Sequence, residues 1–202
     1  AVFATRFGFL NTPPGDGKTG VVKGKALDDR AGCAMLVELL RRTHPVNVVG
    51  VFSVQEEIGL RGAQVAAHKV DPDLSIVLEC TTADDLPPAP DEPIGYPRLG
   101  DGPCLTIMDR SFIAGRQLLE HIKTTAERRN IPWQYKRPGL GGTDSGAIHK
   151  SRAGIPSVTV AVPARYIHSP AALVQLTDFW HCVELIAAAL RHMPQRRPDP
   201  SL

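Results

Sequence analysis

Short apolar runs rich in β-branched residues alternate along the chain with stretches in which apolar residues recur at helical spacing. The chain opens this pattern with a predicted strand at Val21–Leu27 and a predicted helix at Asp29–Thr43. It continues with predicted strands at Val46–Val54, Leu74–Leu78, Leu105–Met108, Trp133–Lys136 and Ile155–Val162, and predicted helices at Leu60–Lys69, Phe112–Arg129, Thr143–Lys150 and Ala172–His192. The alternation predicts an α/β fold of three layers, in which a mostly parallel or mixed sheet carries helices on both faces.

Two segments lack any periodic pattern. Thr81–Pro103 holds six prolines and is predicted to be a loop. The tail that starts at Pro194 is rich in proline and arginine and is predicted to be disordered. The sequence therefore indicates one domain over residues 1–193 and a disordered tail over residues 194–202.

The composition narrows the class of protein. With 202 residues, of which 43% are hydrophobic, the chain can bury a core. A net charge of +2 and an aromatic content of 5% argue against nucleic acid as a partner. No apolar run is long enough for a membrane span, and the four cysteines show no paired spacing, so we expect reduced thiols and a cytoplasmic location.

Polar residues follow four of the predicted strands at the point where each strand ends. They are Asp28, the pair Glu56 and Glu57, Glu79, and, after a short loop, His168. The carboxyl ends of parallel strands lie along one edge of an open α/β sheet, where ligands bind. We therefore expect these side chains to meet there.

Taken singly, each of these residues also has a purely structural explanation. Asp28 could cap a helix, the Glu56–Glu57 pair could be a solvated first turn, and His168 could be a hydrogen-bonded loop residue. Taken together, several carboxylates at one edge repel each other unless a cation neutralises them. A divalent metal held by carboxylates and an imidazole would do so, with a spare glutamate as general base.

Four motifs in order carry a family resemblance. The chain resembles the M42 family of zinc aminopeptidases, which includes glutamyl aminopeptidases, tetrahedral aminopeptidases and relatives once named endoglucanases. The motifs are KALDDRAGCA (Lys25–Ala34), VQEEIGLRGA (Val54–Ala63), GGTDSGAIH (Gly141–His149) and ARYIHSP (Ala164–Pro170). The resemblance implies a zinc-exopeptidase-like fold, peptide substrates, Zn²⁺ with Co²⁺ as the alternative, and compatibility with a homo-oligomer.

The resemblance also implies roles for single residues. Asp28 matches a carboxylate that bridges two metals, and its peptide bond to Asp29 is expected to be cis. Glu57 and His168 match ligands of one metal. The remaining matches are Glu79 as a ligand of the second metal, Glu56 as the general base, and Asp144 with Gly142 in a turn that contacts substrate.

The family pattern also contains an upstream histidine and an inserted β-rich domain, and neither is found in this chain. We therefore expect one well-formed metal site of the two that the intact family holds. The predicted function is a metal-dependent aminopeptidase that releases N-terminal amino acids through a metal-activated water. The alternative is a catalytically impaired fragment that binds one metal or a partner without turnover.

Two further motifs invite other interpretations. Gly15–Gly20 resembles a phosphate loop, but it lacks the first glycine of that motif and is predicted to be a surface turn. Ser145, with His149 or His168, could belong to a serine hydrolase, although the spacing around it is not that of a nucleophile elbow. A chelator separates the two classes, because only a metallopeptidase would lose activity.

Overall fold

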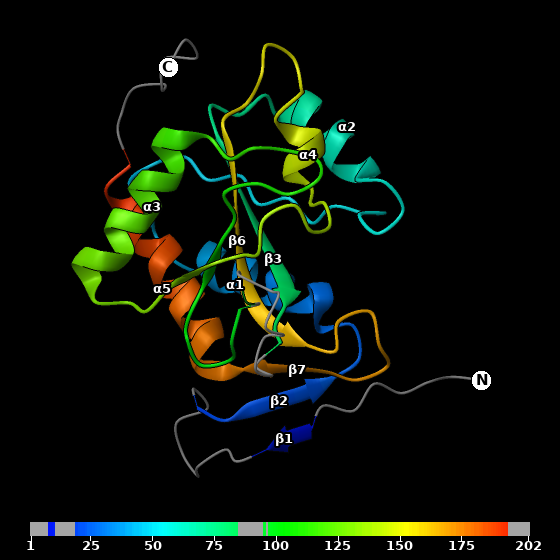
Figure 1. Cartoon of the computed structure of the whole chain (residues 1–202). Helices are drawn as coiled ribbons and strands as arrows, with labels where there is room; N and C mark the ends of the chain where they lie inside the picture. The colour runs from blue at the N-terminus through cyan, green and yellow to red at the C-terminus, as the bar shows by residue number, and fades with distance from the viewer. Residues whose placement is uncertain (1–7, 11–18, 85–94, 96, 194–202) are drawn as a thin grey trace.

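The computed structural model describes residues 8–10, 19–84, 95 and 97–193 (Figure 1). Strand β6 (Ser157–Arg165) lies at the centre of a mixed sheet. It pairs in parallel with β3 (Ser75–Thr82) and antiparallel with β4 (Cys104–Leu105) and β7 (Ala172–Gln175). The sheet extends through β2 (Val21–Gly24) and β1 (Gly8–Leu10) on the β7 side and β5 (Gln134–Tyr135) on the β4 side.

Helices lie on both sides of this sheet, as the alternating pattern predicts. Helix α1 (Leu27–Leu40) packs on β3 and on α5 (Leu176–Arg191), and α3 (Arg116–Arg129) packs on α5. The short helix α4 (Ser145–Ile148) contacts β3 and β6, and α2 (Arg61–Val70) packs against α4. Of the two alternatives for the sheet, the mixed one is correct.

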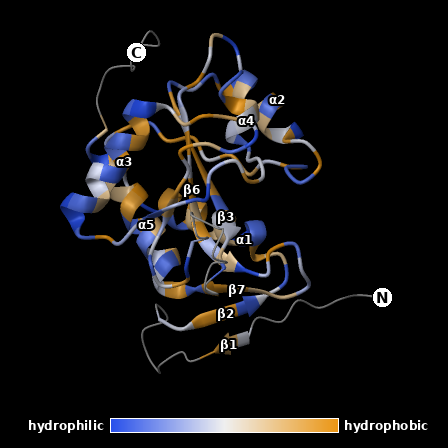
Figure 2. Cartoon of the chain, in the orientation of Figure 1, coloured by the Kyte–Doolittle hydropathy of each residue, from blue (hydrophilic) through white to orange (hydrophobic). Residues whose placement is uncertain are grey.

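The core forms where β6 meets the helices. Val158, Val160 and Val162 of β6 are fully buried, and so are Cys182 and Leu185 of α5. Figure 2 shows β6 as a hydrophobic strand and a mixture of hydrophobic and hydrophilic residues along α3, which is the pattern of a helix with one buried side. Within the described residues, no helix is both long and apolar enough to cross a membrane.

The predicted strand at Val46–Val54 is wrong. The backbone there is irregular, and no described strand pairs with it. Val49, Phe52 and Val54 are 64%, 51% and 67% exposed, whereas Val46 and Val48 are partly buried against the core. β-Branched residues favour a strand only when a neighbouring strand satisfies the backbone and covers the side chains.

Two helices begin later than predicted, because the residues before them bond to the sheet. The predicted helix at Ala172–His192 begins only at Leu176, because Ala172–Gln175 pairs with both β2 and β6 as strand β7. The predicted helix at Phe112–Arg129 begins at Arg116, because the backbone before it bonds to the sheet through Gly115 N–H and the carbonyl of Ser157.

Three other predicted strands are shorter than expected, and one of them, Trp133–Lys136, pairs only as β5 over Gln134–Tyr135. Val21–Leu27 pairs only as far as Gly24, and Leu27 already opens α1. Leu105–Met108 contributes only Leu105 to β4. The tail over residues 194–202, most of Gly15–Gly20 and much of Thr81–Pro103 lie outside the described residues.

Candidate metal centre

Asp28 stands at the junction between a strand and a helix. β2 ends at Gly24, and the chain turns through Ala26 in the left-handed region before α1 begins. The peptide bond between Asp28 and Asp29 is cis, as predicted. The Asp28 side chain is only 12% exposed. Burial, followed by the charge of Glu57, raises the pKa of Asp28 above its ordinary value.

Three predicted ligands converge on one point. His168, in the loop after β6, places its Nε2 atom 3.2 Å from Asp28 Oδ2 and 3.3 Å from Glu57 Oε2. One ligand atom from each residue lies within 4.8 Å of the other two. An imidazole nitrogen with two carboxylate oxygens is a donor set that zinc accepts in catalytic sites, and the histidine and glutamate are exposed enough to leave a coordination position open.

Glu56 lies beside this group in the turn that precedes α2. The backbone N–H groups of Gly59 and Leu60 both donate to its carbonyl oxygen, at 3.0 Å each, and this holds the turn closed. Burial, then the charges of Asp144, Glu57 and Asp28, raise the pKa of Glu56 to about 7. A carboxylate with a pKa near neutrality is suited to accept and return a proton.

Glu79 lies on β3 and is 6% exposed. Its carboxyl group accepts a hydrogen bond from the N–H of Cys80 at 3.2 Å and is hydrogen-bonded to Asp28. Burial, then the charges of Asp29, Asp28 and Glu56, raise its pKa well above the ordinary value. The structure thus brings Glu79 to Asp28, but among the described residues it completes no three-ligand group there.

Asp29 and Cys80 were missed by the sequence reasoning, and both join the acidic cluster. With Asp28 they form a second group of ligand atoms within 4.8 Å of one another. Asp29 Oδ1 accepts the N–H of Gly32 at 2.9 Å, and an added Cβ on Gly32 would lie 2.2 Å from Asp29 Oδ2. Burial raises the pKa of Asp29 to about 8. The Asp-x-x-Gly spacing is a signal that could have found it.

Asp144 faces the same cluster from the start of α4. Its Oδ2 accepts a hydrogen bond from the hydroxyl of Ser53, and its Oδ1 is buried without a partner among the described residues. Burial raises the pKa of Asp144. Gly142 is exposed in the turn just before it. Ser53 was missed, because a lone serine in an apolar run carries no distinctive signal.

A buried polar network holds the turn that carries Asp144. Asp109 Oδ1 accepts the N–H of Ser111 at 2.6 Å, and its Oδ2 accepts the hydroxyl of Thr143 at 3.3 Å. The hydroxyl of Thr159 on β6 is hydrogen-bonded to the hydroxyls of Thr143 and Ser145, at 2.9 and 2.8 Å. The Ser145 hydroxyl is therefore fully buried and committed to Thr159, which does not support a nucleophilic role.

His149 does not activate Ser145 either. Its Nδ1 contacts the backbone carbonyl of Ser145 at 2.8 Å and not the hydroxyl. His168 lies with Asp28 and Glu57 instead. The arrangement of the polar groups thus favours metal binding over serine hydrolysis.

Known aminopeptidases are similar to this chain in sequence. A sequence profile described as M42 glutamyl aminopeptidase matches residues 4–185. A putative aminopeptidase of Acetivibrio thermocellus is 37% identical over 171 residues, which are 84% of this chain and 51% of that protein. The glutamyl aminopeptidase of Lactococcus lactis is 36% identical over 172 residues, which are 82% of this chain and 46% of that protein.

Solved structures show the same fold. The TET aminopeptidase of a marine-sediment Thaumarchaeota archaeon superimposes with a TM-score of 0.81 at 42% identity, covering 87% of this chain and 50% of that one. An aminopeptidase of Desulfurococcus kamchatkensis gives a TM-score of 0.80 at 33% identity, covering 85% of this chain and 49% of that one. The chain therefore spans about half the length of the relatives that it matches.

Proposed function

We propose, from the premise that this chain belongs to the M42 family of aminopeptidases, that it carries the catalytic site of a metal-dependent enzyme releasing N-terminal amino acids from peptides. The observation that carries the proposal is the convergence of Asp28, Glu57 and His168 beside Glu56. Three ligand side chains and a spare carboxylate are what metal-assisted hydrolysis needs.

Asp28, Glu57 and His168 would hold Zn²⁺, with Co²⁺ as the alternative. A bound cation would supply Lewis acidity, polarising the scissile carbonyl and lowering the pKa of a water. Glu56 would take a proton from the attacking water and return it to the leaving amine, for which a pKa of about 7 is suited. Asp144, whose Oδ1 lacks a described partner, and the exposed Gly142 would contact the substrate.

We further propose that this chain holds one ion tightly. Glu79 and Asp28 would contribute to a second site, but among the described residues they gather no histidine of their own. One ion without turnover is the outcome that would favour the alternative, a fragment that binds metal but is catalytically impaired. Relatives form a dodecamer or assemble into tetrahedral and octahedral shells, and we propose a homo-oligomer for this protein as well.

Calorimetric titration of the metal-free chain with Zn²⁺ tests the metal site. We expect one tight ion, lost in His168→Ala and kept in the control His192→Ala, which alters an exposed histidine at the end of α5. Two tight ions would contradict the single-site expectation. Absence of Zn²⁺ binding would overturn the proposed metal site.

Hydrolysis of amino-acid p-nitroanilides by the zinc-loaded chain tests catalysis. Loss of a general base lowers the rate by about 10²–10⁴-fold, so we expect Glu56→Gln to abolish any measurable turnover while keeping zinc bound. Equal rates for Glu56→Gln and the unaltered chain would contradict the role given to Glu56. Turnover that survives a chelator would contradict metal dependence.

A further inference from the structure

A groove runs between α2 and α4, and it is lined by none of the residues to which a role is assigned above. The two helices lie side by side (Figure 1). The cavity between them and the segment after α4 has a volume of about 760 Å³. Leu60 and Gly146 line one end of it, and His68, Lys150 and Arg152 line the other.

The first end of the groove adjoins the candidate catalytic loops. Leu60 donates its N–H to the carbonyl of Glu56 at 3.0 Å, and Gly146 donates its N–H to the carbonyl of Thr143 at 2.8 Å. An added Cβ on Gly146 would lie 3.3 Å from Leu60 Cδ1, so the two walls approach van der Waals contact here. The groove therefore starts within one turn of Glu56 and Asp144.

The far end is basic. Lys150 is exposed and pairs with no carboxylate of a described residue. Arg152 donates through Nε and Nη2 to the carbonyl of His68, at 2.9 and 2.6 Å, and lies 3.4 Å from Asp71, which fixes the guanidinium at the rim. None of the described residues that line the groove is acidic, and Asp71 at its rim already pairs with Arg152. Lys150 therefore carries the positive charge that a negatively charged ligand would complement.

The length of the groove fits a short peptide. From Leu60 to His68 the helix rises by about 12 Å at about 1.5 Å per residue. An extended peptide advances by about 3.3 Å per residue, so the same span holds roughly three to four residues. A substrate with its N-terminus at the metal centre must lead the rest of its chain away from that centre, and this groove begins there.

We infer that the α2–α4 groove binds the part of the peptide that follows the scissile bond, and that Lys150 receives a carboxylate three to four residues beyond that bond. The inference rests on the proposed aminopeptidase function and names its preferred substrates. They are short peptides with a free C-terminus or an acidic residue at that place. The side chains of Leu60 and Val65 supply an apolar wall for the intervening residues.

Calorimetry with three pentapeptides tests the inference. The chain carries Glu56→Gln and is loaded with zinc, so that the peptide stays intact. The peptides are Leu-Ala-Ala-Ala-Ala as the free acid, the same peptide as the amide, and the amide with Asp at the last position. A charge-assisted contact at an exposed site predicts that the free acid binds about threefold to tenfold tighter than the amide. The Asp-containing amide distinguishes an acidic side chain from the terminal carboxylate.

Lys150→Ala is expected to abolish the difference between acid and amide. The matched control is Lys69→Ala, which removes a lysine from the last turn of α2 that does not line the groove, and it should keep the difference. Lys150→Gln, which retains most of the side chain, should behave as Lys150→Ala does. Equal binding of acid and amide, equal effects of the two lysine changes, or no binding of any peptide would overturn the inference.

The metal titration separates this inference from the proposed function. Lys150→Ala should bind zinc as the unaltered chain does, because no described contact joins the lysine to Asp28, Glu57 or His168. If the unaltered chain bound no zinc, the proposed function would fail, while a surviving preference for the free acid would still support the groove. If zinc bound and the preference were missing, only the groove would fail.

Discussion

At the scale of single residues, the acidic cluster is governed by burial and mutual repulsion. Asp29, Glu56 and Glu79 all have raised pKa values, and burial is the largest cause in each case. Uncompensated carboxylates in such a place hold protons until a cation replaces them. A divalent metal, as proposed above, would therefore compete with protons for these groups.

The metal-free chain should therefore become less stable as the pH rises. The pKa of Glu56 is 4.5 ordinarily and about 7 after burial in the fold, so between these values the folded chain binds more protons than the unfolded chain. The free energy of unfolding then falls as the pH increases through this window. Asp29, whose pKa is raised by burial from 3.8 to about 8, extends the fall to higher pH.

Thermal unfolding followed by circular dichroism in chelator checks this prediction. We expect the Tm to fall between about pH 5 and about pH 8 and the fall to be shallower in Glu56→Gln, because one titrating group is removed. Glu127→Gln, which alters an exposed glutamate on α3, is the control and should follow the unaltered chain. A Tm that rises across this range would contradict the raised pKa values.

Ser53, in the segment before Glu56, contacts the turn that carries Asp144. Its hydroxyl donates to Asp144 Oδ2, while Oδ1 already lacks a described partner. Ser53→Ala would leave both oxygens of a buried carboxyl unpaired, which costs about 1–3 kcal/mol of stability. Ser53→Thr retains a hydroxyl and should recover part of the loss. Chemical denaturation of the unaltered chain and the two Ser53 variants measures the loss of stability. Equal denaturation midpoints would contradict the role of this hydrogen bond.

The meeting of Asp28 and His168 could be predicted from the sequence, because they follow β2 and β6 of the same sheet. Glu57 joins them although Val46–Val54 is not a strand, so its place depends on the irregular segment that precedes it. The sequence could not reveal Ser53, because its importance depends on the folded path of another loop. The buried network around Asp109 was equally hidden, since its partners lie on a turn and on β6.

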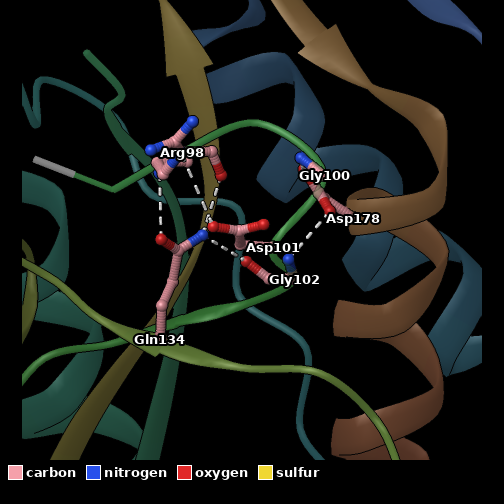
Figure 3. Close-up of polar contacts among 6 residues, drawn as sticks. All are labelled: Arg98, Gly100, Asp101, Gly102, Gln134 and Asp178. Atoms are coloured by element: carbon pink, nitrogen blue, oxygen red, sulfur yellow. Dashed lines mark hydrogen bonds and ion pairs between the residues drawn. The ribbon is translucent and has the colours of Figure 1, made fainter. Parts of the chain in front are cut away.

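At the scale of elements, a buried carboxylate fixes the start of α5. Figure 3 shows Asp178 accepting the N–H groups of Gly100 and Gly102, at 2.7 and 3.0 Å. In the same view, Gln134 of β5 bonds to both backbone groups of Arg98 and to the carbonyl of Gly102. The segment before β4 is thereby tied to α5 and to β5.

Asp178→Ala should destabilise the protein strongly. The side chain is fully buried, and its loss leaves two backbone donors without their acceptor, at about 1–3 kcal/mol each. The control is Asp101→Asn, which breaks only the exposed Arg98–Asp101 pair at 3.9 Å and should change stability by less than about 1 kcal/mol. Urea denaturation measures both. Hydrogen exchange should rise at Gly100 and Gly102 in Asp178→Ala alone.

Strand pairing explains which elements could be predicted. Helix spacing identified α1, α2 and α3 to within a few residues, because an amphipathic helix is encoded locally. β7 was assigned to a helix, since the run Ala172–Gln175 becomes a strand only through its neighbours β2 and β6. Local sequence carries no information about a partner that is far away along the chain.

At the scale of the whole molecule, one surface departs from the usual arrangement of apolar residues. Val49, Val51, Phe52 and Val54 are all exposed in the irregular segment that precedes Glu56. Val37 and Leu40 of α1 are also more than 40% exposed. A segment with several exposed β-branched and aromatic residues favours association with another chain.

The isolated chain should therefore self-associate through this segment in a concentration-dependent way. Val49→Lys places a charge in this segment and should shift light scattering and gel-filtration profiles towards the monomer. Ile113→Lys is the control, because Ile113 is 73% exposed but lies outside this segment. The two variants should have similar stability, since the side chains of Val49 and Ile113 are both exposed. If Val49→Lys and Ile113→Lys shifted the profiles equally, the effect would come from added charge alone and not from this segment.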